Sequence, residues 1–244
     1  MGRRRRRPQN RLLAFLVDVV VILLIALVVS WGVRTFLFRT FYVPSSSMVS
    51  TLEVNDRIIV NNLYPEVFGL ERGDVVVFKD PGGWLASSSS ASSTGPLDAL
   101  ASFFGFGGQE SNEYLVKRVI GLPGDHIVCC DAQGRLQING VSIDETYLDE
   151  GVAPSLQEFD VTVPEDSLWV MGDNRAHSAD SRANMDSPLG GFVPEDNVVG
   201  RAVVISYPIS RWTFLDNYAS VFAAVPDPSE EGSAQSGTAT AASS

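Results

Sequence analysis

The sequence predicts a mainly β protein, in which an antiparallel β domain follows one transmembrane α-helix. Two observations carry this prediction. One long apolar run lies near the N-terminus, and short apolar runs separated by turns make up most of the remaining chain. No amphipathic helical pattern of convincing length follows the first run. With 244 residues, the chain is long enough for one membrane anchor and one sizeable domain.

The apolar run extends from Leu12 to Val33 and contains one charged residue, Asp18. As a helix that rises about 1.5 Å per residue, it spans roughly 30 Å, which is the thickness of a bilayer core. The many leucine, isoleucine and valine residues offset the cost of inserting one off-centre charge. The alternative is a cleavable signal peptide, but the run is longer than the apolar region of such peptides and ends in a poor cleavage site. We therefore predict an uncleaved anchor.

Charge is distributed unevenly along the chain. Residues 1–39 hold eight arginines and one acidic residue, whereas the remainder holds ten basic and 28 acidic residues. The positive-inside rule places the basic N-terminus, residues 1–11, in the cytoplasm and everything after Arg34 outside it. We expect a single-pass protein of the plasma membrane, with the lipid bilayer as a partner. The acidic outer part lacks the basic surface that nucleic acids require, so we expect no nucleic-acid partner.

Six runs in the second part of the chain have the composition of β-strands. They are Arg57–Asn62, Asp74–Phe78, Tyr114–Ile120, His126–Cys130, Ser167–Met171 and Val198–Tyr207. Asn139-Gly140 stands between two alternating runs, which is the strongest short signal for a β-hairpin. These runs predict an extracytoplasmic β domain over residues 34–227.

Two segments have a low-complexity composition. Residues 81–111 contain a long serine run, which predicts a flexible insertion within the β domain. Its part Leu97–Phe106 suits either a segment at the membrane surface or a small satellite packed on the core. The tail, residues 228–244, consists mostly of small and polar residues, and we expect it to be disordered because it cannot bury apolar surface.

The chain has only two cysteines and two histidines, and we predict neither a metal site nor a cofactor. Cys129 and Cys130 are adjacent and do not have the spacing of metal ligands. Outside the cell, the pair suits either a disulfide between neighbours or two thiols on opposite faces of a strand. We favour the two thiols and assign them no catalytic role.

A hydroxyl-rich stretch follows the anchor closely. Ser45, Ser46 and Ser47 come directly after Pro44, whose ring fixes its own φ and favours an extended conformation for Val43. Serine runs are common in loops, so the stretch indicates a nucleophile only in combination with other motifs. Because a short segment separates these serines from the anchor, we expect a substrate at the membrane.

Lys117 lies within an apolar strand pattern, next to Arg118. Successive side chains of a strand point to opposite faces, so one of the two faces inward unless the strand is bulged. Lysine can lose its proton when it is desolvated, whereas arginine stays charged. To act as a base near pH 7 to 8, the lysine needs a pKa about 2–3 units below its usual value. His177 is the only plausible base for a serine–histidine triad, so a serine–lysine pair is simpler.

Two further motifs accompany the serines and the lysine. Arg72-Gly73-Asp74 leads into one predicted strand, and a turn, Gly121-Leu122-Pro123-Gly124, follows the strand that holds Lys117. A polar loop, Met171 to Arg182 (MGDNRAHSADSR), follows another predicted strand.

These motifs, in this order and after an N-terminal anchor, resemble the bacterial type I signal peptidases. The resemblance covers the chain from about Leu12 to Tyr207, apart from the insertion. It implies an antiparallel β catalytic domain of signal-peptidase type and a membrane-bound serine endopeptidase. It also implies that the enzyme removes signal peptides from secretory preproteins, as they emerge from the protein translocation machinery, by cleaving after Ala-x-Ala sites.

The resemblance also implies roles for individual residues. Ser47 is the nucleophile and Lys117 the neutral general base. The Ser45 hydroxyl and the Ser47 N–H form the oxyanion hole, and Ser178 donates a hydrogen bond that orients the lysine amine. Asp180 and Arg182 form a supporting ion pair, and Gly172, Asp173 and Asn174 shape the loop behind the site.

By the same resemblance, apolar side chains form two shallow pockets, S1 and S3, for small substrate residues and desolvate the lysine. They are Phe41, Val43, Pro44, Met48, Leu52, Ile58, Leu115 and Val116. The backbones of residues 42–44 and 115–117 are expected to pair with an extended substrate as an added strand.

The sequence departs from the family pattern at a few positions. Ser50 stands where the family often has proline, which leaves that turn looser. Ala176 and His177 replace an acidic residue and an asparagine in the polar loop, and His177 adds a group that titrates near neutral pH.

Two other functions fit parts of the pattern. An acyltransferase of the penicillin-binding type needs a lysine three residues after the serine, but Ser50 occupies that place after Ser47. An anchored β domain that binds exported proteins or cell-wall components would need no catalytic residues at all.

Overall fold

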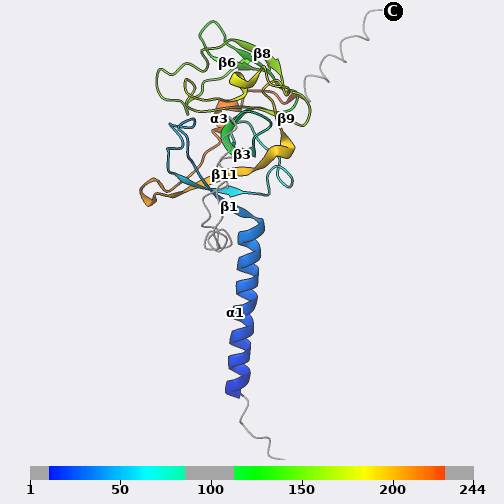
Figure 1. The fold of residues 1–244 in the computed structure, drawn as a ribbon, viewed down its shortest axis with the longest axis vertical. Coiled ribbons are helices and arrows are strands. Elements are labelled where there is room, and N and C mark those ends of the chain that lie inside the picture. Colours follow the sequence, from blue (N-terminus) through cyan, green and yellow to red (C-terminus); the bar gives the residue numbers. More distant parts are fainter. Residues whose placement is uncertain (1–10, 86–112, 229–244) are drawn as a thin grey trace, which may run out of the picture. The chain divides into compact units, whose positions relative to one another are not determined.

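The computed structural model describes residues 11–85 and 113–228, in which a long helix precedes a β domain (Figure 1). The basic N-terminus up to residue 10, residues 86–111 of the predicted insertion and the tail from residue 229 lie outside the described residues. The chain divides into two compact units, Met1–Arg39 and Thr40–Ser244.

The first unit holds helix α1, Arg11–Phe36, which is slightly longer than the predicted anchor. Residues Ala14–Gly32 form a segment long and apolar enough to cross a membrane, with a mean hydropathy of 2.8 and none of it buried in the protein. A helix that is apolar on all sides needs apolar surroundings, which here no other part of the described protein supplies. Its composition is therefore that of a membrane span.

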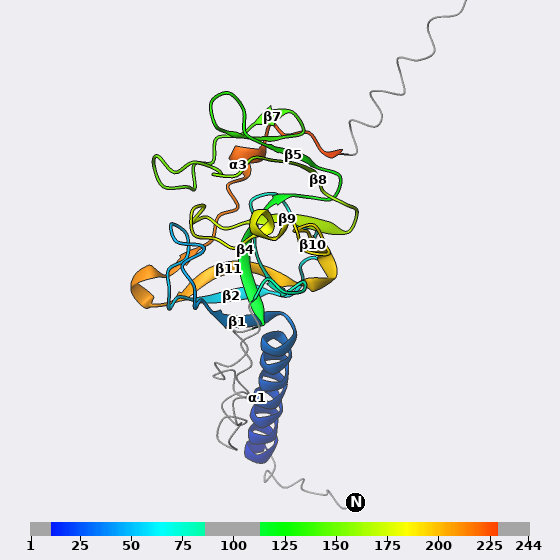
Figure 2. The same ribbon diagram turned by 45° about the horizontal axis from the view of Figure 1, so that its top comes forward.

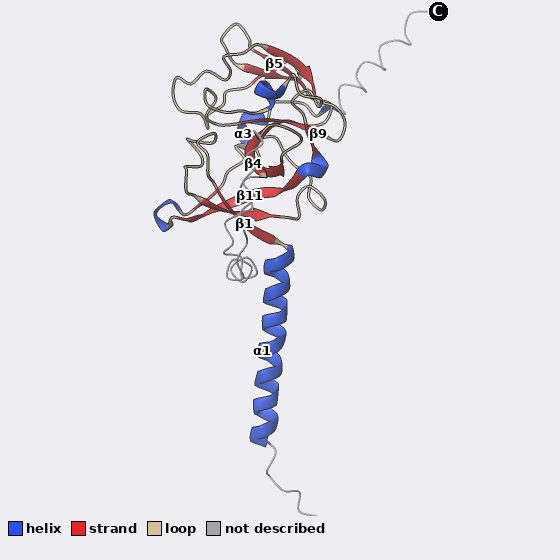
Figure 3. Cartoon of the chain, viewed as in Figure 1, coloured by secondary structure: helices blue, strands red, loops and turns tan. Residues whose placement is uncertain are grey.

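The second unit consists almost entirely of β-strands and turns (Figure 3). Its strands are β1 (Phe38–Tyr42), β2 (Arg57–Asn61), β3 (Val75–Lys79), β4 (Tyr114–Gly121), β5 (His126–Cys129), β6 (Leu136–Ile138), β7 (Val141–Ser142), β8 (Phe159–Thr162), β9 (Ser167–Met171), β10 (Val193–Pro194), β11 (Val198–Tyr207) and β12 (Thr213–Phe214). Its helical turns are η2 (Ser181–Asn184), η3 (Glu195–Asn197), η4 (Ile209–Arg211) and α3 (Ala219–Phe222). The predicted mainly β fold is confirmed.

Two sheets form the domain. The larger has eight strands in the order β1-β2-β11-β3-β4-β9-β10, with β12 paired to β11, and the smaller has the order β7-β6-β5-β8. Every pairing with a recorded register is antiparallel. Figure 2 shows the small sheet at one end of the domain and strands β1, β2 and β11 at the other.

All six predicted strands are present, with ends that differ by at most one residue. The predicted hairpin joins β6 and β7, and its turn residues Asn139 and Gly140 have φ values of 50° and 75°. Both values lie in the left-handed region that a two-residue hairpin turn requires, and asparagine and glycine tolerate that region best. The β3 run Val75–Phe78 does not alternate because this strand is buried on both faces: Val75 and Val77 belong to one apolar cluster and Val76 and Phe78 to another.

Strand β4 buries charged side chains on both of its faces. The sequence predicts that one of the two neighbouring side chains faces inward; in the structure both do, since Lys117 is 2 % exposed and Arg118 is fully buried. Arg118 donates to both carboxylate oxygens of Asp173, at 2.9 and 2.7 Å, and to the carbonyl of Gly73. Asp173 follows β9 by two residues, and Met171 of β9 pairs with Arg118, so the sheet register brings the two charges together.

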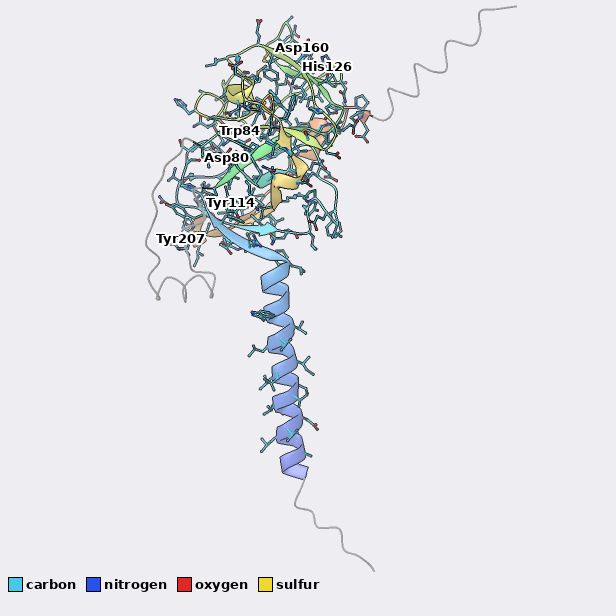
Figure 4. All side chains as sticks on the ribbon, turned by 45° about the vertical axis from the view of Figure 1, so that its right-hand side comes forward. Asp80, Trp84, Tyr114, His126, Asp160 and Tyr207 are labelled. Atoms are coloured by element: carbon cyan, nitrogen blue, oxygen red, sulfur yellow. A yellow bond between two sulfur atoms is a disulfide. The ribbon has the colours of Figure 1, made fainter. Side chains whose placement is uncertain are left out.

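The two histidines have other partners than a serine. The His126 ring, on β5, lies 2.7 Å from the Asp160 carboxylate on β8 (Figure 4). The Nδ1 atom of His177 lies 3.3 Å from Oδ1 of Asn174. Neither ring contacts a serine of the triplet in the described part of the chain, so no serine–histidine triad is formed there.

The two cysteines form a disulfide between neighbours, so the expectation of two thiols is wrong. Strand β5 ends at Cys129, and the alternation of side chains therefore does not extend to Cys130. Both residues pack against the same apolar cluster, which includes Phe159 and Trp169.

Breaking the ion pair between Arg118 and Asp173 should destabilise the domain strongly. Arg118→Met leaves the Asp173 carboxylate buried without its cation, which costs about 3–5 kcal/mol of unfolding free energy. The exposed Arg57, which lies over the Tyr207 ring at 5.5 Å, is the control, and Arg57→Met should cost no more than about 1 kcal/mol. Urea unfolding of the full chain in detergent, followed by tryptophan fluorescence, measures both, and equal losses would contradict the prediction.

Candidate active site

One cavity of about 180 Å³ in the β domain brings two of the predicted motifs together. Its walls are the segment around the serine triplet, the first half of β4, one residue of β3 and one residue of the loop after β3. The lining residues are Phe41, Tyr42, Val43, Pro44, Ser45, Ser47, Met48, Val77, Leu85, Tyr114, Leu115, Val116 and Lys117.

The predicted nucleophile and base meet at this cavity. The Nζ atom of Lys117 lies 2.5 Å from Oγ of Ser47, and the two side chains are 2 % and 8 % exposed. Lys117 sits in the middle of the sheet, opposite Val76 of β3, and this pairing fixes where its amine reaches the cavity. Residues 70 positions apart in the sequence are thus placed in hydrogen-bonding contact by the sheet.

Burial changes the ionisation of Lys117. Desolvation lowers the pKa of its amine from 10.5 to about 8, because the charged form loses its hydration in the protein. The carboxylates of Asp180 and Asp173 oppose this shift, and the guanidinium of Arg182 adds to it. A substantial fraction of the amine is therefore neutral near pH 8, in contact with a hydroxyl that it can deprotonate.

Two hydrogen-bond donors lie next to the Ser47 hydroxyl. The Oγ atom of Ser45 is 3.3 Å from Oγ of Ser47. The backbone N–H of Ser47 has no acceptor among the described residues, although both neighbouring carbonyls, those of Ser46 and Ser47, accept hydrogen bonds. A free N–H beside a nucleophile is one of the groups that can stabilise an oxyanion.

The polar loop after β9 lies directly behind the serines. A Cβ atom on Gly172 would come within 2.4 Å of the Ser47 carbonyl oxygen and within 2.2 Å of Ser178 Oγ. The loop thus approaches Ser47 so closely that only glycine fits at position 172. The Asn174 N–H and side-chain amide donate to the carbonyls of Ser47 and Ser46, each at 3.0 Å.

Ser178 does not make the predicted contact. Its hydroxyl is buried and has no hydrogen-bond partner in the described structure, so the expected bond to the Lys117 amine is absent. The hydroxyl is close to Gly172 instead, on the loop that backs Ser47.

The ion pair predicted between Asp180 and Arg182 is present and buried. Arg182 donates to the two carboxylate oxygens at 2.9 and 2.7 Å. Asp180 also accepts from the N–H of Gly172 at 2.9 Å, and Arg182 donates to the Arg175 carbonyl at 3.0 Å. The pair therefore ties the end of the polar loop to its beginning.

Six of the eight apolar residues predicted for the substrate pockets line the cavity, namely Phe41, Val43, Pro44, Met48, Leu115 and Val116. Leu52 and Ile58 do not line it. Both are fully buried in the apolar cluster that also holds Phe41, Val43 and Met48, so they support the cavity wall from behind.

Several lining residues were not predicted. Leu85 belongs to the segment assigned to the flexible insertion, but residues 81–85 are held by the Asp80 carboxylate, which accepts from the N–H groups of Gly82, Trp84 and Leu85 (Figure 4). The sequence signal for this turn is Asp80-Pro81-Gly82, since an aspartate that precedes proline and glycine favours such a turn. Tyr114 packs edge to face against Phe41, with ring centres 5.3 Å apart.

Ser50 also differs from the usual pattern in its backbone. Its φ angle is 99°, a value that the ring of a proline cannot adopt. The turn after Met48 therefore has a conformation that the proline common at this position would not allow.

The described residues contain no group of three or more histidine, cysteine or acidic side chains placed to hold a metal ion. The chemistry available at the cavity is that of a serine hydroxyl, a partly neutral amine and backbone donors.

A comparison with known protein families identifies the family of the chain. Residues 16–207 match the family described as signal peptidase, peptidase S26. The chain belongs to this family. The matched region includes the serine triplet, β4 with Lys117 and the polar loop, so the site lies within the part of the chain that matches the family.

Several signal peptidases resemble the chain over most of its length. Signal peptidase I of Mycobacterium tuberculosis (strain ATCC 25618 / H37Rv) is 39% identical over 229 residues, which cover 84% of this chain and 76% of the relative. The probable signal peptidase I-2 of Synechocystis sp. is 35% identical and covers 80% and 74% of the two chains. Signal peptidase I U of Bacillus subtilis (strain 168) is 30% identical and covers 83% and 92%.

A crystal structure of a signal peptidase I from Enterococcus faecalis V583 is also similar. It is 27% identical and covers 54% of this chain and 95% of that one, with a TM-score of 0.35, which is too low to support a statement about the fold.

Gly172→Ala should reduce peptidase activity by displacing the nucleophile. The added methyl group meets backbone and side-chain atoms on both sides, and a shift of about 1 Å at a reacting atom costs roughly 100-fold in kcat/KM. Gly69→Ala is the control, because no atom lies within 4 Å of its Cβ position. Cleavage of a preprotein by the two variants in detergent tests this, and an unchanged rate for Gly172→Ala would show that the loop yields instead.

Proposed function

We propose that this signal peptidase cleaves its substrates with Ser47 as the nucleophile and Lys117 as the general base. Enzymes of the family remove signal peptides from secreted preproteins, and this chain is a serine endopeptidase of that kind. The observation that supports the residue assignment is the 2.5 Å contact between the Lys117 amine and the Ser47 hydroxyl in a desolvated cavity.

The reaction follows the chemistry of an activated serine. The neutral Lys117 amine takes the proton of the Ser47 hydroxyl while Oγ attacks the scissile carbonyl carbon. The oxyanion that forms is stabilised by the Ser47 N–H and the Ser45 hydroxyl. Lys117 then returns the proton to the leaving amine, which becomes the N-terminus of the mature protein. Water, deprotonated by Lys117, hydrolyses the ester between Ser47 and the signal peptide.

The geometry of β4 supports binding of the substrate as an added strand. Strand β9 pairs with β4 only from Arg118 onward, which leaves Leu115, Val116 and Lys117 without a β9 partner at that edge. An extended peptide can hydrogen-bond there and place alternate side chains in the cavity. The apolar residues that line the cavity, among them Val43, Met48 and Val116, suit the apolar side chains of an Ala-x-Ala site.

We propose the membrane topology that the sequence predicts. Helix α1 anchors the enzyme in the plasma membrane with a cytoplasmic N-terminus, and the β domain lies outside. Ser47 follows the end of α1 at Phe36 by eleven residues, which span at most roughly 40 Å when extended. The nucleophile thus works close to the bilayer, where the protein translocation machinery delivers preproteins. Family membership favours this function over an acyltransferase or an anchored binding domain.

Removing either member of the pair should abolish cleavage. Ser47→Ala and Lys117→Ala should each lower kcat/KM on an Ala-x-Ala preprotein roughly 10,000-fold or more, because the two groups act as a unit. The matched control is Lys79→Ala, which removes an exposed lysine from β3 and should leave the rate unchanged. Gel-based cleavage by the full chain in detergent measures all three, and activity that survives both substitutions would exclude the proposed pair.

The rate should depend on the ionisation of Lys117. The reaction needs the neutral amine, whose pKa is lowered by desolvation to about 8. Below that pH the neutral fraction falls tenfold per unit, so kcat/KM should rise with pH and level off above about 8. The pH profile of the wild-type enzyme checks this, and a plateau that already begins near pH 6 would contradict it.

A further inference from the structure

We propose that Asn174 is a positioning residue that holds the peptide group between Ser46 and Ser47 in the orientation needed for oxyanion stabilisation. The inference rests on the proposed function, in which the Ser47 N–H is one of two oxyanion donors. It adds a residue of the polar loop that acts on this donor from behind.

Asn174 contacts the nucleophile segment twice. Its side-chain Nδ2 donates to the Ser46 carbonyl and its backbone N–H donates to the Ser47 carbonyl, both at 3.0 Å. The two carbonyls that flank the nucleophile are therefore fixed by one residue from a different part of the chain. Only the first of these bonds depends on the Asn174 side chain, so substitution removes it and leaves the second.

The first bond also determines where the Ser47 N–H points. The Ser46 carbonyl and the Ser47 N–H belong to one planar peptide group, which is trans, so they point in opposite directions. With the carbonyl held towards Asn174, the N–H points away from the polar loop, and it has no acceptor among the described residues. Ser47 lines the cavity and Ser46 does not, in agreement with this orientation.

Without the side-chain bond, the peptide group keeps only a weaker restraint. The Val49 N–H donates to the Ser46 carbonyl at 3.2 Å, but it belongs to the same turn and moves with it. Rotation of the peptide group would turn the N–H out of the cavity and remove one oxyanion donor. A donor bonded to the carbonyl also polarises the peptide group and makes its N–H a stronger donor.

Hydrogen bonds on both sides of Asn174 limit its movement. Its neighbour Asp173 accepts two hydrogen bonds from the buried Arg118 and one from the Thr51 hydroxyl. On the other side, Nδ1 of His177 lies 3.3 Å from Oδ1 of Asn174, which leaves Nδ2 facing Ser46. A side-chain amide that is fixed in this way can determine the orientation of the peptide group it bonds.

The test compares two asparagines with the same kind of bond. Asn174→Ala removes the bond to the Ser46 carbonyl, and Asn197→Ala removes a 3.3 Å bond from Asn197 Nδ2 to the Lys79 carbonyl, outside both the serine segment and the polar loop. Loss of one oxyanion donor typically costs about 100- to 1000-fold in rate. For the full chain in detergent, we expect Asn174→Ala to lower kcat roughly 10- to 100-fold, because the N–H is misoriented for part of the time, with KM within about twofold.

A second readout reports the tetrahedral state directly. A substrate-derived peptide aldehyde accepts the Ser47 oxygen at its carbonyl carbon while Lys117 takes the proton, which forms a stable oxyanion in the same place. Its inhibition constant should rise by the same factor as kcat falls. The pH at which kcat/KM levels off, near 8, should not change in Asn174→Ala, because the carboxylates of Asp173 and Asp180 around Lys117 stay in place. Asn197→Ala should change neither kcat nor the inhibition constant.

Asn174→Asp provides a second variant of nearly identical size. It replaces the donor with a carboxylate oxygen that faces the Ser46 carbonyl, so kcat should fall at least as far as with alanine. The inference is wrong if kcat and aldehyde affinity are unchanged in both Asn174 variants, or if they fall equally in Asn197→Ala. It is also wrong if the loss lies in KM alone. If Ser47→Ala and Lys117→Ala cleave normally, the proposed function fails instead, whatever the asparagine variants show.

Discussion

The site depends on keeping one primary amine out of water and next to a hydroxyl. Lowering the pKa of Lys117 from 10.5 to about 8 corresponds to a cost on the order of 3–4 kcal/mol for the charged form. The packing of the folded domain around Lys117 must offset this cost. Strand β4 is held between β3 and β9, and the apolar residues of the cavity wall stand on a fully buried layer that includes Leu52 and Ile58. The sheet is therefore the means by which the amine stays desolvated.

Burial has opposite consequences for the charges of Lys117 and Arg118, which are neighbours on β4. Lys117 faces a cavity without a directly bonded carboxylate, and its charge is disfavoured. Arg118 faces the other side, where Asp173 pairs with it and the Tyr147 ring lies 4.4 Å from its guanidinium carbon, and its charge is kept. The ion pair between Arg118 and Asp173 fixes the polar loop, and Gly172 of this loop lies directly against Ser47. One strand thus supplies both the proposed base, Lys117, and the residue that anchors the loop behind Ser47, Arg118.

The sequence was sufficient for the strands, the hairpin and the pairing of Ser47 with Lys117, because each has a local pattern or a spaced motif. It was insufficient for contacts that depend on which residues pair between neighbouring strands. Nothing local indicates that Arg118 lies opposite Met171 and so reaches Asp173, or that Ser178 turns towards Gly172 and not towards the lysine.

The disulfide between Cys129 and Cys130 was missed because β5 ends one residue earlier than expected. Leu85 was missed because a turn closed by one carboxylate was counted as part of a low-complexity segment.

The short stretch of β4 that has no β9 partner has a consequence for selectivity and solubility. An exposed strand edge invites any extended chain, including a second copy of the same protein, and long edges promote aggregation. Here the residues without a β9 partner end at Lys117, since Arg118 is already paired. In the proposed binding mode, the backbone bonds over this short stretch do not distinguish one peptide from another, so selection falls to the side chains that fit the cavity. A short edge also offers little template for pairing with a second copy.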